Sequence, residues 1–163
     1  MSYFLHRIQR TGSNTQKGIE THDDLNDAIR SFWGRMKSAY GKSDYTFVSC
    51  KITDDYGNTI GPYNMTWLQD PEQENVYFLH HIRKDGENYD KGIDELSSLD
   101  AAYGNLAELM EYGYDNPKFP NVTCVHCEIT DLLSGGMVLL ESVWNKPTEE
   151  PAPEPEPEPE AAE

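Results

Sequence analysis

In the first third of the chain, the pattern of hydrophobic residues is first typical of strands and then typical of a helix. Residues from Tyr3 to Arg10 are rich in aromatic and aliphatic side chains, which predicts a strand. The turn-forming residues 11–14 (TGSN) follow, and residues 16–20 are expected to form a short returning strand. The chain therefore opens with a predicted pair of strands.

Apolar residues then recur at three- and four-residue spacing from Leu25 to Tyr40, which predicts an amphipathic helix. Asp23 is the expected N-cap, and acidic residues in the first turn suit the helix dipole. Gly41 is a natural residue for the position just after the helix. This segment is expected to bury its apolar stripe against the sheet.

Two further strands are predicted after the helix. From Tyr45 to Thr53 the side chains alternate between two faces, with Val48, Cys50 and Ile52 on one of them. Residues 54–58 form a predicted hairpin turn, and a last strand runs from 59 to 68. Pro62 lies in this last strand, and proline is tolerated best at the edge of a sheet.

The second half of the chain repeats the first. Residues 3–8 (YFLHRI) recur as 77–82 (YFLHHI), and Lys17-Gly18-Ile19 recurs as Lys91-Gly92-Ile93, both at an offset of 74. The offset becomes 77 where residues 50–54 (CKITD) recur as 127–131 (CEITD). In this alignment 21 of 61 positions are identical. We infer a tandem duplication, whose two copies pack around a pseudo-twofold axis like a homodimer fused into one chain.

The second copy has matching predicted elements and one clear difference. Ser98 is the expected N-cap of its helix, a strand is predicted over 122–130, and a last strand over Met137–Trp144. Residues 137–140 (MVLL) form a continuous apolar run, unlike the proline-containing counterpart in the first copy. Such a run is typical of a strand buried on both faces, either inside the chain or by a second molecule.

These elements predict an α+β fold. Each copy is a β(β)αββ unit, and the expected architecture is an antiparallel sheet with one helix per repeat packed on one face. The first repeat is expected over 1–68, a linker over 69–75 and the second repeat over 76–146. Residues 147–163 alternate proline with glutamate, which predicts a disordered acidic tail.

Charge limits the classes of partner. The 163 residues contain 13 Lys and Arg against 29 Asp and Glu, so the formal net charge is −16. The tail carries seven of the glutamates, and without it the charge is still −9. A field of this sign repels nucleic acid phosphates and anionic membranes, so we expect no direct nucleic acid or membrane binding. The same charge favours a basic protein partner.

The beginning of the chain and its cysteines indicate a cytoplasmic protein. The sequence MSYFLHRIQR has no long apolar stretch, so it does not resemble a signal peptide, and no stretch of the chain is long and apolar enough to span a membrane. Three cysteines, Cys50, Cys124 and Cys127, are an odd number and are expected to remain reduced. Cys124 and Cys127 have C-x-x-C spacing, but on a strand they point to opposite faces and make a poor zinc site.

A metal site at the repeat interface is the main chemical candidate. His6 and His80 occupy matching positions, so they could meet near the pseudo-twofold axis, and Glu141 could add a carboxylate. The alternative is that both histidines are half-buried strand residues with structural hydrogen bonds. No residue pattern identifies a catalytic group, and no cofactor is expected.

A surface for a ligand or partner is the second candidate. Lys17 and Lys91 are expected in repeated loops, 10–18 and 84–92, with the glycines of the repeated KGI motif at a bend or bulge. Four aromatic residues of the predicted strands could form a protein interface on an exposed sheet face, or that face could be covered by the second helix or the other repeat. They are Tyr45, Phe47, Tyr63 and Trp67.

The repeated pattern YFLH-x-I, KGI, amphipathic helix, C-x-ITD and closing Trp resembles small proteins of phage and prophage gene clusters in gut Firmicutes. The resemblance covers one copy at a time and thus nearly the whole chain. It implies a setting in the bacterial host cytoplasm, with virion association possible, and carries no activity or site residue.

These observations favour a non-enzymatic protein-binding protein. It would act as an accessory subunit, or as an acidic inhibitor of a basic, nucleic-acid-binding host protein. Self-association through Met137–Trp144 is a further expectation. The alternative class is a metal-dependent enzyme or small-ligand binder with a histidine-centred site at the repeat interface.

Overall fold

The computed structural model describes residues 1–39, 44–69, 74–135 and 137–147. The predicted cap at Gly41, most of the predicted linker and the tail after residue 147 lie outside these ranges. The elements in chain order are β1 (Tyr3–Thr11), β2 (Asn14–His22), α1 (Leu25–Ala39), β3 (Phe47–Asp54), β4 (Thr59–Leu68), β5 (Tyr77–Asp85), β6 (Asn88–Leu96), α2 (Leu99–Met110), β7 (Val122–Asp131) and β8 (Val138–Asn145).

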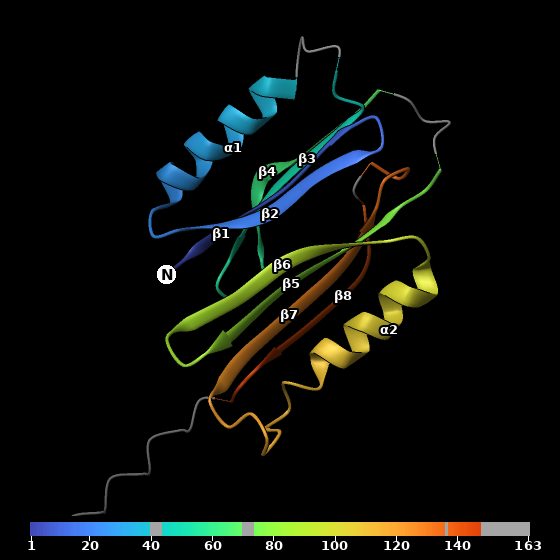
Figure 1. Ribbon diagram of the computed structural model, residues 1–163. Helices are drawn as coiled ribbons and strands as arrows, with labels where there is room; N and C mark the ends of the chain where they lie inside the picture. The colour runs from blue at the N-terminus through green and yellow to red at the C-terminus, as the bar shows by residue number, and fades with distance from the viewer. Residues whose placement is uncertain (40–43, 70–73, 136, 148–163) are drawn as a thin grey trace, which may run out of the picture.

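The fold is α+β, with two antiparallel four-stranded sheets and two helices. The strand order is β2-β1-β3-β4 in the first sheet and β6-β5-β7-β8 in the second. The strand registers also match: Val48 pairs with Trp67 between β3 and β4, and Val125 pairs with Trp144 between β7 and β8. As Figure 1 shows, the helices lie on the outer sides of the molecule and the two sheets lie between them.

Alternation along the strands places apolar residues on both faces of each sheet. On one face, Leu5, Val48, Cys50 and Ile52 form a buried cluster with α1, as the strand pattern predicts. On the other face, Ile8 and Phe47 of the first sheet pack with Phe78 and Ile93 of the second. The rings of Phe47 and Phe78 are stacked, with centroids 6.0 Å apart. The sheets therefore share an apolar core.

The first two strands of each half are joined by a shorter turn than the sequence predicts. Residues 10–18 and 84–92 are not loops, because β1 pairs with β2, and β5 with β6, up to two-residue turns that begin with Gly12 and Gly86. Both glycines have a φ of 60°, which glycine adopts without steric cost. The predicted bulge in the KGI motifs is also wrong, since Gly18 and Gly92 lie in regular register. A Cβ at Gly92 would be 2.9 Å from the His81 ring, so close packing accounts for this glycine.

The helix starts differ by one residue from the prediction in α1 and agree with it in α2. Asp24, not Asp23, caps α1, because its Oδ1 accepts hydrogen bonds from the backbone N–H groups of Asn26 and Asp27. Ser98 caps α2 by accepting from the N–H of Ala101. Trp33 of α1 and Tyr103 of α2 lie outside the buried helix faces and are 48% and 41% exposed.

The prediction for the last strands is correct for β4 and wrong for β8. β4 contains Pro62 and is an edge strand, as expected. β8 is also an edge strand, and its apolar residues other than the half-buried Trp144 are exposed rather than buried inside the chain. Side chains from Val138 to Leu140 are 37–40% exposed and Met137 is 64% exposed. Within the part of the chain that the structure describes, the other half therefore does not bury these residues, whereas burial by a second molecule remains a prediction.

Candidate functional site

A chain of four polar side chains crosses the middle of the sheet-to-sheet core. Nδ1 of His6 on β1 lies 3.1 Å from Nδ1 of His80 on β5, so the two histidines do meet as predicted. Each Nε2 atom lies 3.0 Å from a threonine Oγ1, Thr53 for His6 and Thr130 for His80. The four side chains are buried, and the interaction joins the two sheets.

The electrostatic surroundings keep both histidines neutral. Burial and the nearby Lys51 ammonium hold the pKa of His6 and of His80 well below the usual value of 6.5. A neutral imidazole has one donor and one acceptor nitrogen, which is what a bond between two Nδ1 atoms needs. This arrangement matches the structural interpretation of the two histidines, because both ring nitrogens of each are already occupied.

A buried ion pair lies beside the histidines. Lys51 of β3 donates to Oε2 of Glu128 of β7, and both side chains are at most 6% exposed. The two residues occupy matching positions in the repeated sequence, so the position carries opposite charges in the two halves. Among the described residues, no group hydrogen-bonds the other oxygen of Glu128, Oε1, although that atom is buried.

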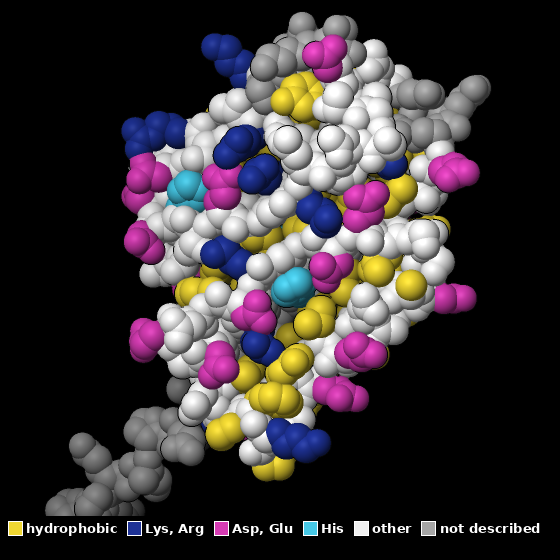
Figure 2. Space-filling view, in the orientation of Figure 1, with side chains coloured by type: hydrophobic (Ala, Val, Ile, Leu, Met, Phe, Trp, Pro, Cys, Tyr) yellow, Lys and Arg dark blue, Asp and Glu magenta, His cyan; other side chains and the backbone are white. Residues whose placement is uncertain are grey.

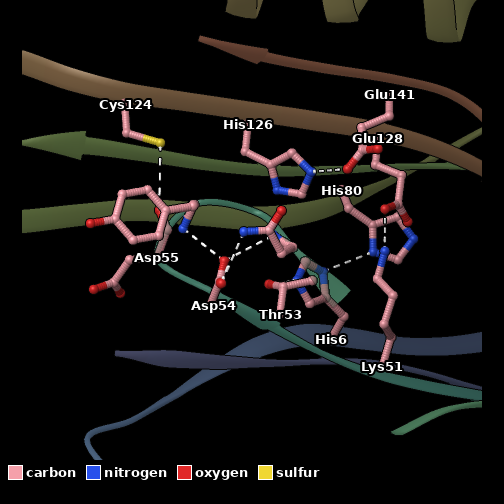
Figure 3. A network of polar contacts seen from close by, with 12 residues as sticks. His6, Lys51, Thr53, Asp54, Asp55, His80, Cys124, His126, Glu128 and Glu141 are labelled. Atoms are coloured by element: carbon pink, nitrogen blue, oxygen red, sulfur yellow. Dashed lines mark hydrogen bonds and ion pairs between the residues drawn. The ribbon is translucent and has the colours of Figure 1, made fainter. Parts of the chain in front are cut away.

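The third predicted metal candidate, Glu141, lies apart from the histidine pair and contacts a different histidine. Its Oε1 accepts a hydrogen bond from Nε2 of His126 at 3.0 Å. Ligand atoms of His126, Glu128 and Glu141 all lie within 4.8 Å of one another. Figure 3 shows these side chains converging from β7 and β8, with Lys51 reaching Glu128 from the opposite sheet.

The sequence interpretation missed His126 and Glu128 as site residues. The signal was available, because residues two apart on a strand share a face and His126 and Glu128 are both on β7. Glu141 pairs with Glu128 across the strands, which places it on the same face. His126 was considered only as part of the C-x-x-C segment. In that segment the two thiols separate as expected: Cys127 lies in the α2 cluster, and Cys124 contacts the Asp55 carbonyl oxygen of the other half.

One side of this group opens to a groove. The His126 ring packs on Gly57, whose φ is 84°, and a Cβ there would be 3.0 Å from the ring. The groove is lined by Glu141, Val143 and the turn residues 56–59. On the inner side a cavity of about 10 Å³ lies between Lys51, Glu128 and the histidine pair, which is the lower limit for one water molecule.

The predicted surface residues are mostly half-buried. Tyr45 and Tyr63 pack against the α1 cluster, and Trp67 is also partly covered. Phe47 is 0% exposed, so it belongs to the core and not to a surface. The remaining two, Lys17 and Lys91, are half-buried residues of β2 and β6 that pair with Ile8 and Ile82.

Two surface features stand out beyond these predictions. β8 presents exposed apolar residues from Val138 to Val143, along an edge that pairs with no other strand among the residues described. A cleft of about 640 Å³ beside α2 is lined by three carboxylates, those of Asp94, Glu108 and Glu111. Acidic side chains are also spread over both halves of the face shown in Figure 2. Within the described residues, no helix has the length and apolar character needed to cross a membrane.

A scan against protein-family models matches none of them, and searches of curated proteins and of solved structures find no similar chain.

Proposed function

We propose that the protein binds another protein through β8, and that the partner segment is extended and basic. The observation that carries this proposal is the unprotected edge of β8. Sheet edges are usually protected by proline or lysine, because an unpaired strand readily pairs with another chain. β4 contains Pro62, and β2 and β6 contain Lys17 and Lys91. β8 has neither residue type, and Glu141 is its one charged residue.

Charge supports a basic partner over a second copy of the chain. Two copies would each carry a net charge of −16, so they would repel one another at long range. A basic segment would be attracted, and its lysines could approach Glu141 and the carboxylates beside α2. Added as a fifth strand, the segment would gain backbone hydrogen bonds and cover the apolar residues of β8.

We also propose that the two halves arose by tandem duplication and form a pseudo-dimer. Support comes from the 21 identical positions, the same strand order and the same strand registers in both sheets. The opposite charges of Lys51 and Glu128 at matching positions favour pairing of unlike halves. In this interpretation β4 and β8 are equivalent edges, of which β8 lost its protection.

Synthetic peptides test the binding mode directly. Fluorescence anisotropy would measure binding of labelled peptides that have the length of β8 and alternate valine with lysine or valine with glutamate. We expect the lysine peptide to bind, with weaker binding at high salt, and the glutamate peptide not to bind. Methylation of alternate backbone nitrogens in the lysine peptide should abolish binding, because it removes the strand's hydrogen-bond donors.

Two leucines provide a matched pair of variants. Leu139 on β8 and Leu133 before it are 40% and 38% exposed. Leu139→Lys should weaken peptide binding about tenfold or more, whereas Leu133→Lys makes the same charge change and should have little effect. Equal effects of the two substitutions, or equal binding of the lysine and glutamate peptides, would contradict the proposal. A stable homodimer in light scattering that only Leu139→Lys disrupts would assign β8 to a second copy instead.

The salt dependence also separates the two biological roles that the sequence leaves open. An acidic inhibitor of a basic host protein would bind with strong salt dependence, since it replaces nucleic acid phosphates as the anionic partner. An accessory subunit of an assembly would depend mainly on apolar burial and would persist in high salt.

A further inference from the structure

Three side chains at the inner face of β7 and β8 have the composition of a metal site. His126 contributes a ring nitrogen, and Glu128 and Glu141 contribute carboxylate oxygens, all within 4.8 Å of one another. The Nε2 of His126 and Oε1 of Glu141 are 3.0 Å apart. We propose that these residues bind a divalent transition-metal ion of the Zn²⁺ type, and this proposal does not rest on protein binding through β8.

An unpartnered oxygen provides a second and independent observation. Glu128 is 1% exposed, and its Oε1 has no hydrogen-bond partner among the described residues. A buried ionised oxygen without a partner is costly, so native structures nearly always satisfy one. The ion pair with Lys51 uses the other oxygen, Oε2. A cation bound to Oε1 would therefore satisfy an atom that the protein itself leaves without a partner.

The charges of the group also favour a cation. The His126 side chain is only 3% exposed, and a neutral imidazole is the form that binds metal. Lys51 balances one of the two carboxylates, which leaves one net negative charge at the site. A divalent ion would make the site positive by one unit, and the acidic surface of the molecule offsets that charge.

Donor types and access define the kind of ion. One nitrogen and two carboxylate oxygens suit Zn²⁺ and similar transition metals, whereas Mg²⁺ and Ca²⁺ prefer oxygen ligands alone. Three protein ligands leave a coordination position open. Glu141 also lines the solvent-facing groove beside residues 56–59, so the open position would be accessible to water or a small anionic ligand.

Other histidine–carboxylate pairs provide an internal comparison. His81 lies 3.7 Å from Asp94, and His22 lies 3.9 Å from Glu20. Among the described residues, neither pair has a third ligating group in reach, and only the His126 group meets that condition. The matching positions in the first half are Ser49, Lys51 and Asn64, so the proposed site belongs to the second half alone.

Titration of the purified full chain with Zn²⁺ and Co²⁺ tests the site. Isothermal titration calorimetry would give the stoichiometry, in a buffer with a reductant that does not bind metal. We expect one Zn²⁺ per chain and no comparable binding of Mg²⁺. The visible bands of bound Co²⁺ should indicate nitrogen and oxygen ligands at low coordination number. Strong near-ultraviolet thiolate bands would instead place the metal on the cysteines and overturn the proposal.

A substitution at the exposed end of the site tests metal binding without unfolding the protein. Glu141 is half-exposed, so Glu141→Gln should leave the fold intact and weaken Zn²⁺ binding at least about tenfold. His126→Gln should weaken it further and change the Co²⁺ spectrum. The matched control His81→Gln should change neither. The proposal would be contradicted if Glu141→Gln left Zn²⁺ binding unchanged, or if the wild-type chain did not bind Zn²⁺ stoichiometrically. Neither result would bear on the proposal for β8, which the lysine and glutamate peptides test in the absence of metal.

Discussion

At the scale of single residues, burial determines how readily the cysteine thiols at matching positions in the two halves ionise and react. Cys50 and Cys127 occupy matching positions, face the helices and are completely buried. Burial raises the pKa of the Cys50 thiol from 9.0 to about 12, because the thiolate loses its hydration. A thiol in this environment acts as a small apolar side chain, which agrees with the structural role predicted for it.

The pKa of Cys50 leads to a prediction about reactivity and pH. The native thiol should react very slowly with iodoacetamide between pH 7 and pH 10, whereas the urea-unfolded chain should react rapidly above about pH 8. The unfolded thiol ionises at lower pH than the folded one, so the free energy of unfolding should fall as pH rises above 9. Mass spectrometry of tryptic peptides would measure the modification at Cys50. Rapid native labelling would show that the residue is accessible.

At the scale of elements, the start of α1 depends on one side-chain oxygen. Asp23 and Asp24 are adjacent, equally charged and both plausible caps in the sequence. The backbone geometry directs only the Asp24 carboxylate toward the N–H groups of the first helical turn. A sequence pattern cannot distinguish these two positions, because the cap is defined by where the chain leaves β2.

This difference is measurable. Asp24→Ala should lower the free energy of unfolding by about 1 kcal/mol, the usual loss for an N-cap. Asp23→Ala removes the same charge near the helix end and should cost less than about half as much. Urea unfolding of the two variants, followed by circular dichroism, gives the comparison. Equal losses would mean that charge near the helix dipole matters here and the specific cap does not.

At the scale of the whole molecule, the two sheets depend on one shared core. Phe47 and Ile8 from the first half pack with Phe78 and Ile93 from the second, and the His6–His80 interaction joins the same faces. Neither sheet can bury its inner face alone. Each half has about the size at which an isolated domain is marginal, so mutual burial is expected to make folding cooperative.

Truncation of Phe78 tests this cooperation. Phe78→Ala should lower the free energy of unfolding by about 3–5 kcal/mol, because it leaves a cavity against Phe47. Unfolding should remain one transition that coincides by circular dichroism and by tryptophan fluorescence, since Trp33, Trp67 and Trp144 report on both halves. Two separate transitions would show that the first half folds without the second.

The sequence by itself predicted the order of strands and helices, the similarity of the two halves and the face of the strand over 45–53 that packs on a helix. These properties depend on periods of two and 3.6 residues, which are local. The sequence also offered His6 and His80 as residues that could meet, because they occupy matching positions in the two halves. The strand over 122–130 and the cap at Ser98 were likewise predictable from residues close in the chain.

Only the tertiary structure decided which side chains meet between the sheets. The contacts of Lys51 with Glu128 and of Cys124 with Asp55 join residues 77 and 69 positions apart, which no local period encodes. The same holds for β8: an apolar run predicts burial, but the strand order places it at an edge. The hydrophobic pattern of a segment indicates that the segment favours burial. Which element or molecule buries it depends on the packing of elements that are distant in the sequence, or on a binding partner.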